Sequence, residues 1–235
     1  MISLKNISVG YHEEIFDSGD LFLNKGKIYA LVGKNGAGKS TFLKTLSREI
    51  TLLDGDIEYD GNDLSAISLD DLTHLLSFVP SRFPQMEFLR VREFVGLGRT
   101  PYLSILGKLS KRDLDLVDEA LKKTHANHLA DRFTSNLSDG ECQLVAIARA
   151  FVQESDIILL DEPTAHLDYL NKRKVFDLLV TIAQQEGKCI IISTHDIDIA
   201  IEACDQFLMI DDLKKHMSLI QNPSKEELIS LAYRE

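Results

Sequence analysis

The sequence contains no run of apolar residues long enough to cross a membrane. A membrane-spanning helix needs about 20 such residues, whereas the longest apolar runs here, around residues 157–160 and 189–192, have the length of a strand. The N-terminus also lacks a basic segment followed by an apolar run, so no signal peptide is expected. If the protein acts at a membrane, another chain must cross that membrane.

Cysteine and basic residues are also scarce. The three cysteines, Cys142, Cys189 and Cys204, are scattered and form no C-x-x-C pair, which favours ordinary buried thiols in a reducing, cytosolic setting. The 26 Lys and Arg residues are outnumbered by 37 Asp and Glu residues, giving a formal net charge of −11. Nucleic-acid binders usually present a basic face, so no nucleic-acid partner is predicted.

What the sequence does contain is an alternation of strand and helix patterns. Its 235 residues fit one α/β domain, or one domain with a small helical insertion. Residues 2–8 alternate apolar and polar side chains, which predicts an edge or half-buried strand. Further strands are predicted over 27–32, 57–59, 157–160 and 188–193, helices over 39–48, 140–153 and 170–185, and a final hairpin over 207–210 and 216–220. This alternation predicts an α/β fold with a largely parallel sheet.

The middle of the chain has a different character. Strand signals are absent between about residues 90 and 137, where Leu114, Val117 and Leu121 recur at helical spacing. We therefore expect a single domain over 1–235, with its core at about 1–89 and 154–235 and a helical insertion at about 90–153. Ser224, with Glu227 three residues later, is expected to cap a last helix.

A glycine-rich segment follows the predicted strand 27–32. Residues 33–40 match G-x-x-x-x-G-K-[ST] without a mismatch. Its glycines let the backbone wrap around phosphates, and the following helix adds its positive dipole end. Lys39 would reach the β- and γ-phosphates, and the Ser40 hydroxyl would hold Mg²⁺. The candidate ATP-binding residues in this loop are Gly33, Asn35, Gly36, Ala37, Gly38, Lys39, Ser40 and Thr41.

Two acids follow the apolar run at 157–160. The carboxyl end of a strand beside such a loop is where an α/β sheet places its ligand. Asp161 can hold Mg²⁺ there, directly or through water. Glu162 is positioned to polarise an attacking water. Together with the loop, the pair predicts an enzyme that binds and hydrolyses ATP.

Several further segments narrow the class. Residues 137–141, Leu-Ser-Asp-Gly-Glu, resemble the LSGGQ signature of ABC ATPases, and the residues after them resemble the family's signature helix. Residues 161–164, 167–168 and 194–196 resemble its Walker B, D-loop and switch-histidine segments, in the family's order. The resemblance covers essentially the whole chain. It implies a P-loop NTPase core with a largely parallel sheet, an N-terminal antiparallel β portion and an inserted α-helical subdomain.

The resemblance also implies roles for single residues. Tyr11 matches the aromatic residue that stacks on adenine. Ser138 and Gly140 would bind the γ-phosphate held by the opposite subunit, so that two copies sandwich two ATP molecules. His195 would contact the γ-phosphate and hold Glu162 and the water in place. Asp168 of the D-loop is a further candidate at the nucleotide.

The region after the first helices indicates a particular kind of ABC ATPase. Residues 92–102, with the helix that holds Asp113, resemble the helical domain of ATPases serving iron–siderophore, haem and cobalamin importers; a generic helical domain is the alternative. The importer reading implies integral membrane permease subunits, a second copy of this chain and, indirectly, a binding protein. It implies a position on the cytoplasmic face of the inner membrane. An exporter ATPase and a soluble assembly ATPase of the iron–sulfur cluster type stay open as alternatives.

Two positions depart from the family's pattern. Ser81 stands after the strand 76–79, where the family usually has a glutamine that contacts Mg²⁺ and links the site to its membrane partner. Gln85 is a candidate substitute in this coupling loop, and we expect altered coupling with intact ATP binding. Asp139 replaces the second-position glycine of the signature. Its charge near a γ-phosphate site predicts weaker ATP-driven dimerisation.

Overall fold

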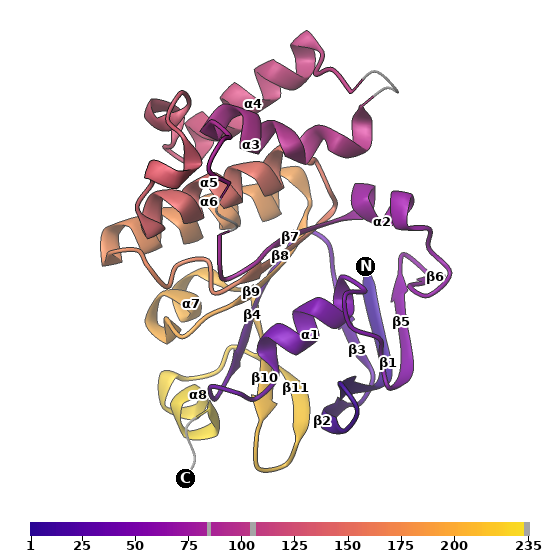
Figure 1. Ribbon diagram of the computed structural model, residues 1–235. Helices are drawn as coiled ribbons and strands as arrows, with labels where there is room; N and C mark the ends of the chain where they lie inside the picture. Colours follow the sequence, from indigo (N-terminus) through magenta and orange to yellow (C-terminus); the bar gives the residue numbers. More distant parts are fainter. Residues whose placement is uncertain (84–85, 104–106, 233–235) are drawn as a thin grey trace.

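The architecture is a twisted sheet with helices on both of its faces (Figure 1). The computed structural model describes residues 1–83, 86–103 and 107–232. Within these residues an 11-stranded sheet runs in the order β6-β5-β1-β2-β11-β10-β4-β9-β8-β7, with β3 paired to β1. The strands are β1 (Ile2–Gly10), β2 (Glu14–Ser18), β3 (Leu21–Leu23), β4 (Ile28–Gly33), β5 (Asp54–Tyr59), β6 (Asn62–Asp63), β7 (Leu76–Val79), β8 (Ile157–Asp161), β9 (Cys189–Ser193), β10 (Gln206–Asp211) and β11 (His216–Gln221).

The α-helices include those predicted over 39–48, 140–153 and 170–185, together with one over 69–75 that was not predicted from the sequence. They are α1 (Lys39–Leu46), α2 (Leu69–Leu75), α3 (Val91–Gly96), α4 (Lys111–Lys123), α5 (Asp139–Val152), α6 (Tyr169–Glu186), α7 (Ile197–Ala203) and α8 (Lys225–Ala232). A 3₁₀ segment, η1 (Leu97–Tyr102), follows α3. The predicted cap of the last helix is confirmed, because the backbone N–H of Glu227 donates to Ser224 Oγ at 3.1 Å. None of the described helices is both long and apolar enough to cross a bilayer.

The parallel half of the sheet is confirmed as predicted. β7, β8, β9, β4 and β10 pair in parallel. Every residue of β4, β8 and β9 is buried, as expected for strands covered on both faces. Phe42 of α1 packs on one face with Leu31 and Leu159. Phe176 of α6 packs on the other face with Ala30 and Ile158.

The first strand was predicted to be an edge or half-buried strand, and it is neither, because it is paired on both sides and most of its residues are buried. β1 pairs antiparallel with β2, β3 and β5. Asn6 adopts a positive φ of 46° where the register with β5 shifts. At this bulge the side chains that face the core change from even-numbered to odd-numbered positions. Leu4 and Ile7 are both fully buried in the same core cluster as a result. The antiparallel N-terminal portion that the resemblance implies is therefore present.

Helices α3, α4 and α5 follow β7 and precede β8 in the chain, and they lie together at one end of the molecule (Figure 1). They enclose a cluster of their own, in which Phe94 packs with Val117 and Val145. The opposite side of α5 packs on the sheet through residues such as Ile147. Residues of α5 therefore contribute to both hydrophobic clusters, so this helix links α3 and α4 to the sheet.

Candidate functional site

The glycine-rich loop connects β4 to α1. Gly36 and Gly38 have φ angles of 85° and 101°, which L-residues with a side chain rarely adopt. A Cβ on Gly38 would also come within 3.0 Å of Ile15 Cγ2 and Phe16 Cε1. The second strand therefore packs directly on the loop, and Gly38 is required there both by backbone conformation and by space.

Lys39 is held inside this loop. Its side chain is buried, and Nζ donates to the carbonyl oxygens of Gly33 and Lys34 at 3.0 and 3.2 Å. Burial lowers the pKa of Lys39, and the carboxylates of Glu162 and Asp161 oppose that effect. The lysine therefore lies in the field of both acids. The next residue, Ser40, is exposed, while Thr41 is buried.

The ends of β8 and β9 meet beside the loop and are hydrogen-bonded to each other. Ser193 Oγ donates to Asp161 Oδ1 at 2.7 Å and accepts from the backbone N–H of Glu162 at 2.8 Å. Glu162 has a φ of 48°, a left-handed conformation that costs a non-glycine residue about 1–3 kcal/mol. Such a conformation persists where surrounding contacts fix it, and the backbone N–H of Glu162 donates to both the hydroxyl and the carbonyl oxygen of Ser193, at 2.8 and 3.2 Å.

The predicted catalytic pair is in contact. His195 Nε2 lies 2.8 Å from Glu162 Oε1, and each side chain is about one-third exposed, at 34% and 32%. The pair is therefore both ordered and open to solvent at the carboxyl ends of the parallel strands. A carboxylate there can accept a proton from water, and a histidine beside it can orient it.

The signature residues form a second group. Ser138 caps α5, its hydroxyl and backbone N–H both donating to Glu141 Oε2, at 2.9 and 2.8 Å. The donation by the Ser138 backbone holds the pKa of Glu141 below its usual range. A Cβ on Gly140 would come within 3.1 Å of Leu167 Cδ2, so the start of α5 packs against the D-loop. Asp168 caps α6 through the backbone N–H of Asn171 at 2.9 Å.

Three predicted residues lie outside these groups. Tyr11 is 60% exposed between β1 and β2, next to the strand that packs on Gly38. The Ser81 carbonyl accepts a hydrogen bond from Gln143 Nε2 of α5 at 2.9 Å, so the coupling loop is tied to the signature helix. Gln85 lies outside the described residues.

The residues that link the loops were not predicted from the sequence. Ser193 is one, and the signal was available: a hydroxyl at the end of an otherwise apolar buried strand. Gln143 is another, a buried amide within an apolar helix face. A third link joins Asp196 to Thr164 and Lys172, at 3.0 and 2.7 Å. No local pattern indicates this link, because its partners are more than 20 residues apart.

A glycine-rich loop on a strand–helix turn, with an acid pair and a histidine at the adjoining strand ends, defines a P-loop ATPase. The family model described as ABC transporter matches residues 16–165. The chain belongs to the ABC transporter family, as an ATP-binding and ATP-hydrolysing cassette. The predicted family, fold class and enzyme class are confirmed.

The relatives agree with this assignment. The achromobactin transport ATP-binding protein CbrD of Dickeya dadantii is 36% identical over 89% of this chain and 78% of its own length. The probable siderophore transport system ATP-binding protein YusV of Bacillus subtilis is 35% identical over 90% of this chain and 77% of its own. The first name refers to achromobactin transport and the second to siderophore transport, and each describes the relative itself.

Two solved structures match closely. One is an ABC transporter described as of the metal-chelate type, in an inward-facing conformation, with a TM-score of 0.83, 30% identity and coverage of 98% of this chain and 88% of that one. The other is a dimeric ATP-binding cassette in a post-hydrolysis state with ADP and phosphate, with a TM-score of 0.83, 26% identity and coverage of 95% and 100%. The arrangement of the sheet and helices described above is therefore that of known ATP-binding cassettes.

Proposed function

We propose that this chain is the ATP-hydrolysing subunit of an ABC importer for iron–siderophore, haem or cobalamin-type chelates. The observation that carries the hydrolytic part is the 2.8 Å contact between Glu162 and His195 beside the glycine-rich loop. Relatives named for achromobactin and siderophore transport support the cargo class. In this proposal Glu162 is the general base, His195 orients it, and Tyr11 supports the adenine.

The donor set at the strand end fits Mg²⁺. That ion prefers hard oxygen ligands, commonly one or two carboxylates together with substrate phosphates. Asp161 is a buried carboxylate whose Oδ1 is fixed by Ser193 at 2.7 Å, and Ser40 adds an exposed hydroxyl at the start of α1. We propose that these two residues hold Mg²⁺, which would neutralise charge on the phosphates of ATP.

The two groups of site residues are proposed to complete each other across a dimer. Ser138, Gly140 and Asp168 lie where α5 meets the D-loop, and the matched cassette structure is a dimer. In a two-fold sandwich each chain would present these residues to the γ-phosphate held by the other copy. We propose one domain over 1–235, with a core of 1–89 and 154–235 and a helical portion of 90–153 that carries the signature.

Replacement of Asp139 by glycine is expected to strengthen ATP-driven dimerisation. Asp139 is exposed at the first position of α5, directly after Ser138. A negative charge near a γ-phosphate opposes closure, and its removal should tighten the dimer about 5-fold, equivalent to about 1 kcal/mol. Sedimentation velocity with ATP, in the background of a hydrolysis-deficient variant, measures this. A dimer no tighter than that of the parent chain contradicts the prediction.

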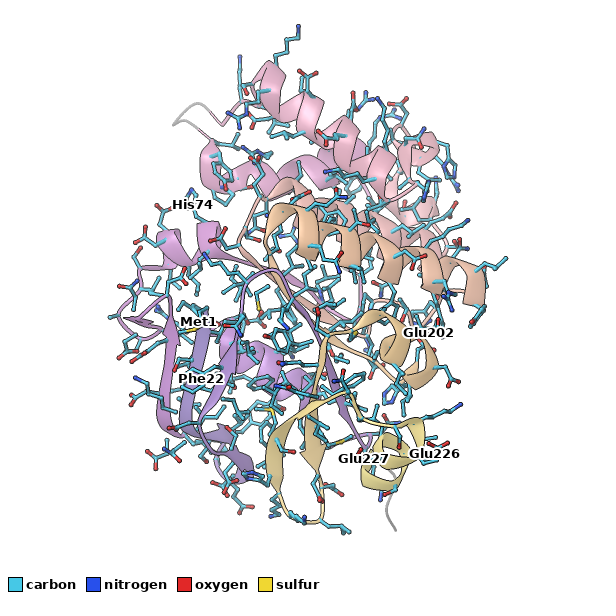
Figure 2. The ribbon with its side chains drawn as sticks, turned by 180° about the vertical axis from the view of Figure 1, so that it is seen from behind. Met1, Phe22, His74, Glu202, Glu226 and Glu227 are labelled. Atoms are coloured by element: carbon cyan, nitrogen blue, oxygen red, sulfur yellow. The ribbon has the colours of Figure 1, made fainter. Side chains whose placement is uncertain are left out.

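A groove beside the coupling loop is proposed as the contact for a permease. It has a volume of about 1230 Å³ and is lined by residues that include Leu69 of α2, Leu97 of η1 and Pro80. His74 of α2, labelled in Figure 2, contacts Tyr102 of η1 in an edge-to-face arrangement, with ring centroids 4.9 Å apart. Leu69 is 69% exposed. A groove between the core and the helical portion, lined by both apolar and polar side chains, fits an amphipathic helix of the permease.

The test is affinity purification of the tagged chain from detergent-solubilised native membranes, followed by mass spectrometry. The parent chain should bring down a many-spanning permease in stoichiometric amount, whereas Leu69→Glu should lose it at least 10-fold. Leu213→Glu is the matched control, because Leu213 is 66% exposed and lies beyond β10, at the end of the molecule away from α2 (Figure 1). That variant should retain the permease.

The outcomes separate the candidate functions. A permease accompanied by an extracytoplasmic binding protein supports import, on the cytoplasmic face of the inner membrane. A permease of exporter type makes the chain an exporter ATPase. Soluble partners alone, under conditions that preserve a control transporter, overturn the transporter proposal in favour of an assembly ATPase. Equal loss with Leu69→Glu and Leu213→Glu excludes the groove as the contact.

A further inference from the structure

Three side chains from separate elements meet behind the Glu162–His195 pair. Asp196 Oδ2 accepts from Thr164 Oγ1 at 3.0 Å, and Asp196 Oδ1 accepts from Lys172 Nζ at 2.7 Å. Thr164 follows Glu162 by two residues in the loop after β8, Asp196 directly follows His195 after β9, and Lys172 lies in the first turn of α6. We call these three residues the clamp.

The use of Asp196 is unusual for its position. It stands at the N-cap of α7, where an aspartate ordinarily accepts hydrogen bonds from its own helix. Here its side chain makes no such bond. Both carboxylate oxygens are engaged by other elements instead, and its backbone N–H donates to Thr194 Oγ1 at 3.0 Å. The residue is therefore committed to joining the two loops rather than to stabilising α7.

The clamp is well enclosed. Thr164 is 1% exposed, and the side chains of Lys172 and Asp196 are 20% and 24% exposed. Charged hydrogen bonds in such surroundings are shorter and stronger than neutral ones. Without the lysine, the part-buried carboxylate of Asp196 would lack a counter-charge and would be drawn toward solvent or toward the N-terminus of α7. Either movement breaks its contact with Thr164.

We infer that Lys172 is a positioning residue for ATP hydrolysis, acting through Asp196 and Thr164 to fix the distance between the loops that carry His195 and Glu162. This inference rests on the proposed roles of those two residues. If it is correct, loss of the clamp makes the relative position of Glu162 and His195 less well defined during hydrolysis. The glycine-rich loop that binds ATP is unchanged. A displacement of about 1 Å at a catalytic group lowers turnover by up to about 100-fold.

The experiment compares Lys172→Met with Arg173→Met in the purified full-length chain. Arg173 is the next residue of the same helix and also ties α6 to α7, through Glu202 at 2.6 Å; Glu202 is labelled in Figure 2, on the outer side of α7. Lys172→Met should lower kcat about 10-fold, leave KM and the ATP dissociation constant from calorimetry unchanged, and be largely rescued in Lys172→Arg. Arg173→Met should retain the parent kcat.

Thr164→Val provides a second route to the same measurement, because it removes the hydroxyl while keeping shape. It should lower kcat in the same way, and Thr164→Val with Lys172→Met should be no slower than the poorer single variant, since both break one unit. An unchanged kcat in Lys172→Met and Thr164→Val, or an equal loss in Lys172→Met and Arg173→Met, overturns the inference. Glu162→Gln, measured alongside, keeps the two proposals separate: full activity there overturns the general-base role itself.

Discussion

Replacement of Glu162 by glutamine is expected to lower ATP hydrolysis by about 10²–10⁴-fold, the usual contribution of a general base. The glutamine amide keeps the size and shape of the side chain but cannot accept a proton from water. ATP binding should persist, because Lys39 and the glycine-rich loop are unchanged. The ATP-bound dimer should therefore accumulate, since hydrolysis is the step that removes the γ-phosphate contact between the two copies.

Two hydrogen-bonded contacts fix the position of Glu162. Glu162 is held by the backbone hydrogen bond to Ser193 at 2.8 Å and by the His195 contact at 2.8 Å. Glutamine can keep both contacts, so the variant should fold and melt as the parent chain does. Phosphate release under single-turnover conditions measures the chemical step, and size-exclusion chromatography with ATP measures the dimer.

Glu226→Gln is the matched control for the loss of a carboxylate. Glu226 is exposed in the first turn of α8 and is labelled in Figure 2. Its replacement should leave hydrolysis unchanged. If Glu162→Gln kept more than a tenth of the parent rate while still binding ATP, another group would have to accept the proton, and the role assigned to the Glu162–His195 pair would be wrong.

The elements that the sequence predicted well are those with a strong local signal. β8 and β9 are apolar runs that each end in one polar residue, and the glycine-rich loop between β4 and α1 needs residue types that few other structures demand. Each of these signals lies within about ten consecutive residues. The predictions for the parallel half of the sheet and for the position of the loop were correct for that reason.

The elements it missed depend on partners far along the chain. β2 and β3 have 5 and 3 residues and carry little pattern of their own, so β1 was expected to be an edge or half-buried strand although both of them pair with it. The bulge at Asn6 also broke the alternation on which that expectation relied. Likewise, Thr164 and Asp196 are 32 residues apart. Contacts of this kind form only when the sheet brings distant segments together, so they cannot be deduced from neighbouring residues.

Replacement of Arg99 by methionine is expected to destabilise the chain by about 3 kcal/mol, the lower end of the range for breaking a buried ion pair. The Arg99 side chain is only 4% exposed, and its Nε donates to Asp113 Oδ1 at 2.8 Å. Its Nη1 donates to the carbonyl of Val152 at 2.8 Å and to Glu154 Oε2 at 2.6 Å. The guanidinium also lies 3.9 Å from the ring centre of Tyr102. One side chain therefore joins η1, α4 and the end of α5.

Methionine fills much of the same volume but donates no hydrogen bond. The carboxylate of Asp113 and the carbonyl of Val152 would each lose a partner in a place where water has little access. The midpoint of thermal unfolding should fall by about 6–12 °C, given about 2–4 °C per kcal/mol for a chain of this size. Urea unfolding followed by circular dichroism measures the free energy directly.

Arg92→Met is the control, because Arg92 belongs to the same helical portion but pairs at the surface. It lies 3.2 Å from Asp118, with a side chain 46% exposed, and exposed pairs of this kind contribute about 0–1 kcal/mol. If Arg92→Met and Arg99→Met lowered stability equally, the burial of Arg99 would not be the cause of the loss.

The difference between the parent chain and Arg99→Met should also depend on pH. The Ser110 hydroxyl and backbone, followed by Arg99, hold the pKa of Asp113 below its usual range. A lowered pKa means stability that is present above the unfolded value of about 3.9 and is lost as pH falls through the folded value. Once Asp113 is protonated the parent chain has also lost the ion pair, so the gap between the two proteins should narrow in acid. A gap that stays constant from pH 7 down to a pH at which Asp113 is protonated in the folded chain would show that the contacts of Arg99 with Val152 and Tyr102, rather than its pair with Asp113, account for its effect.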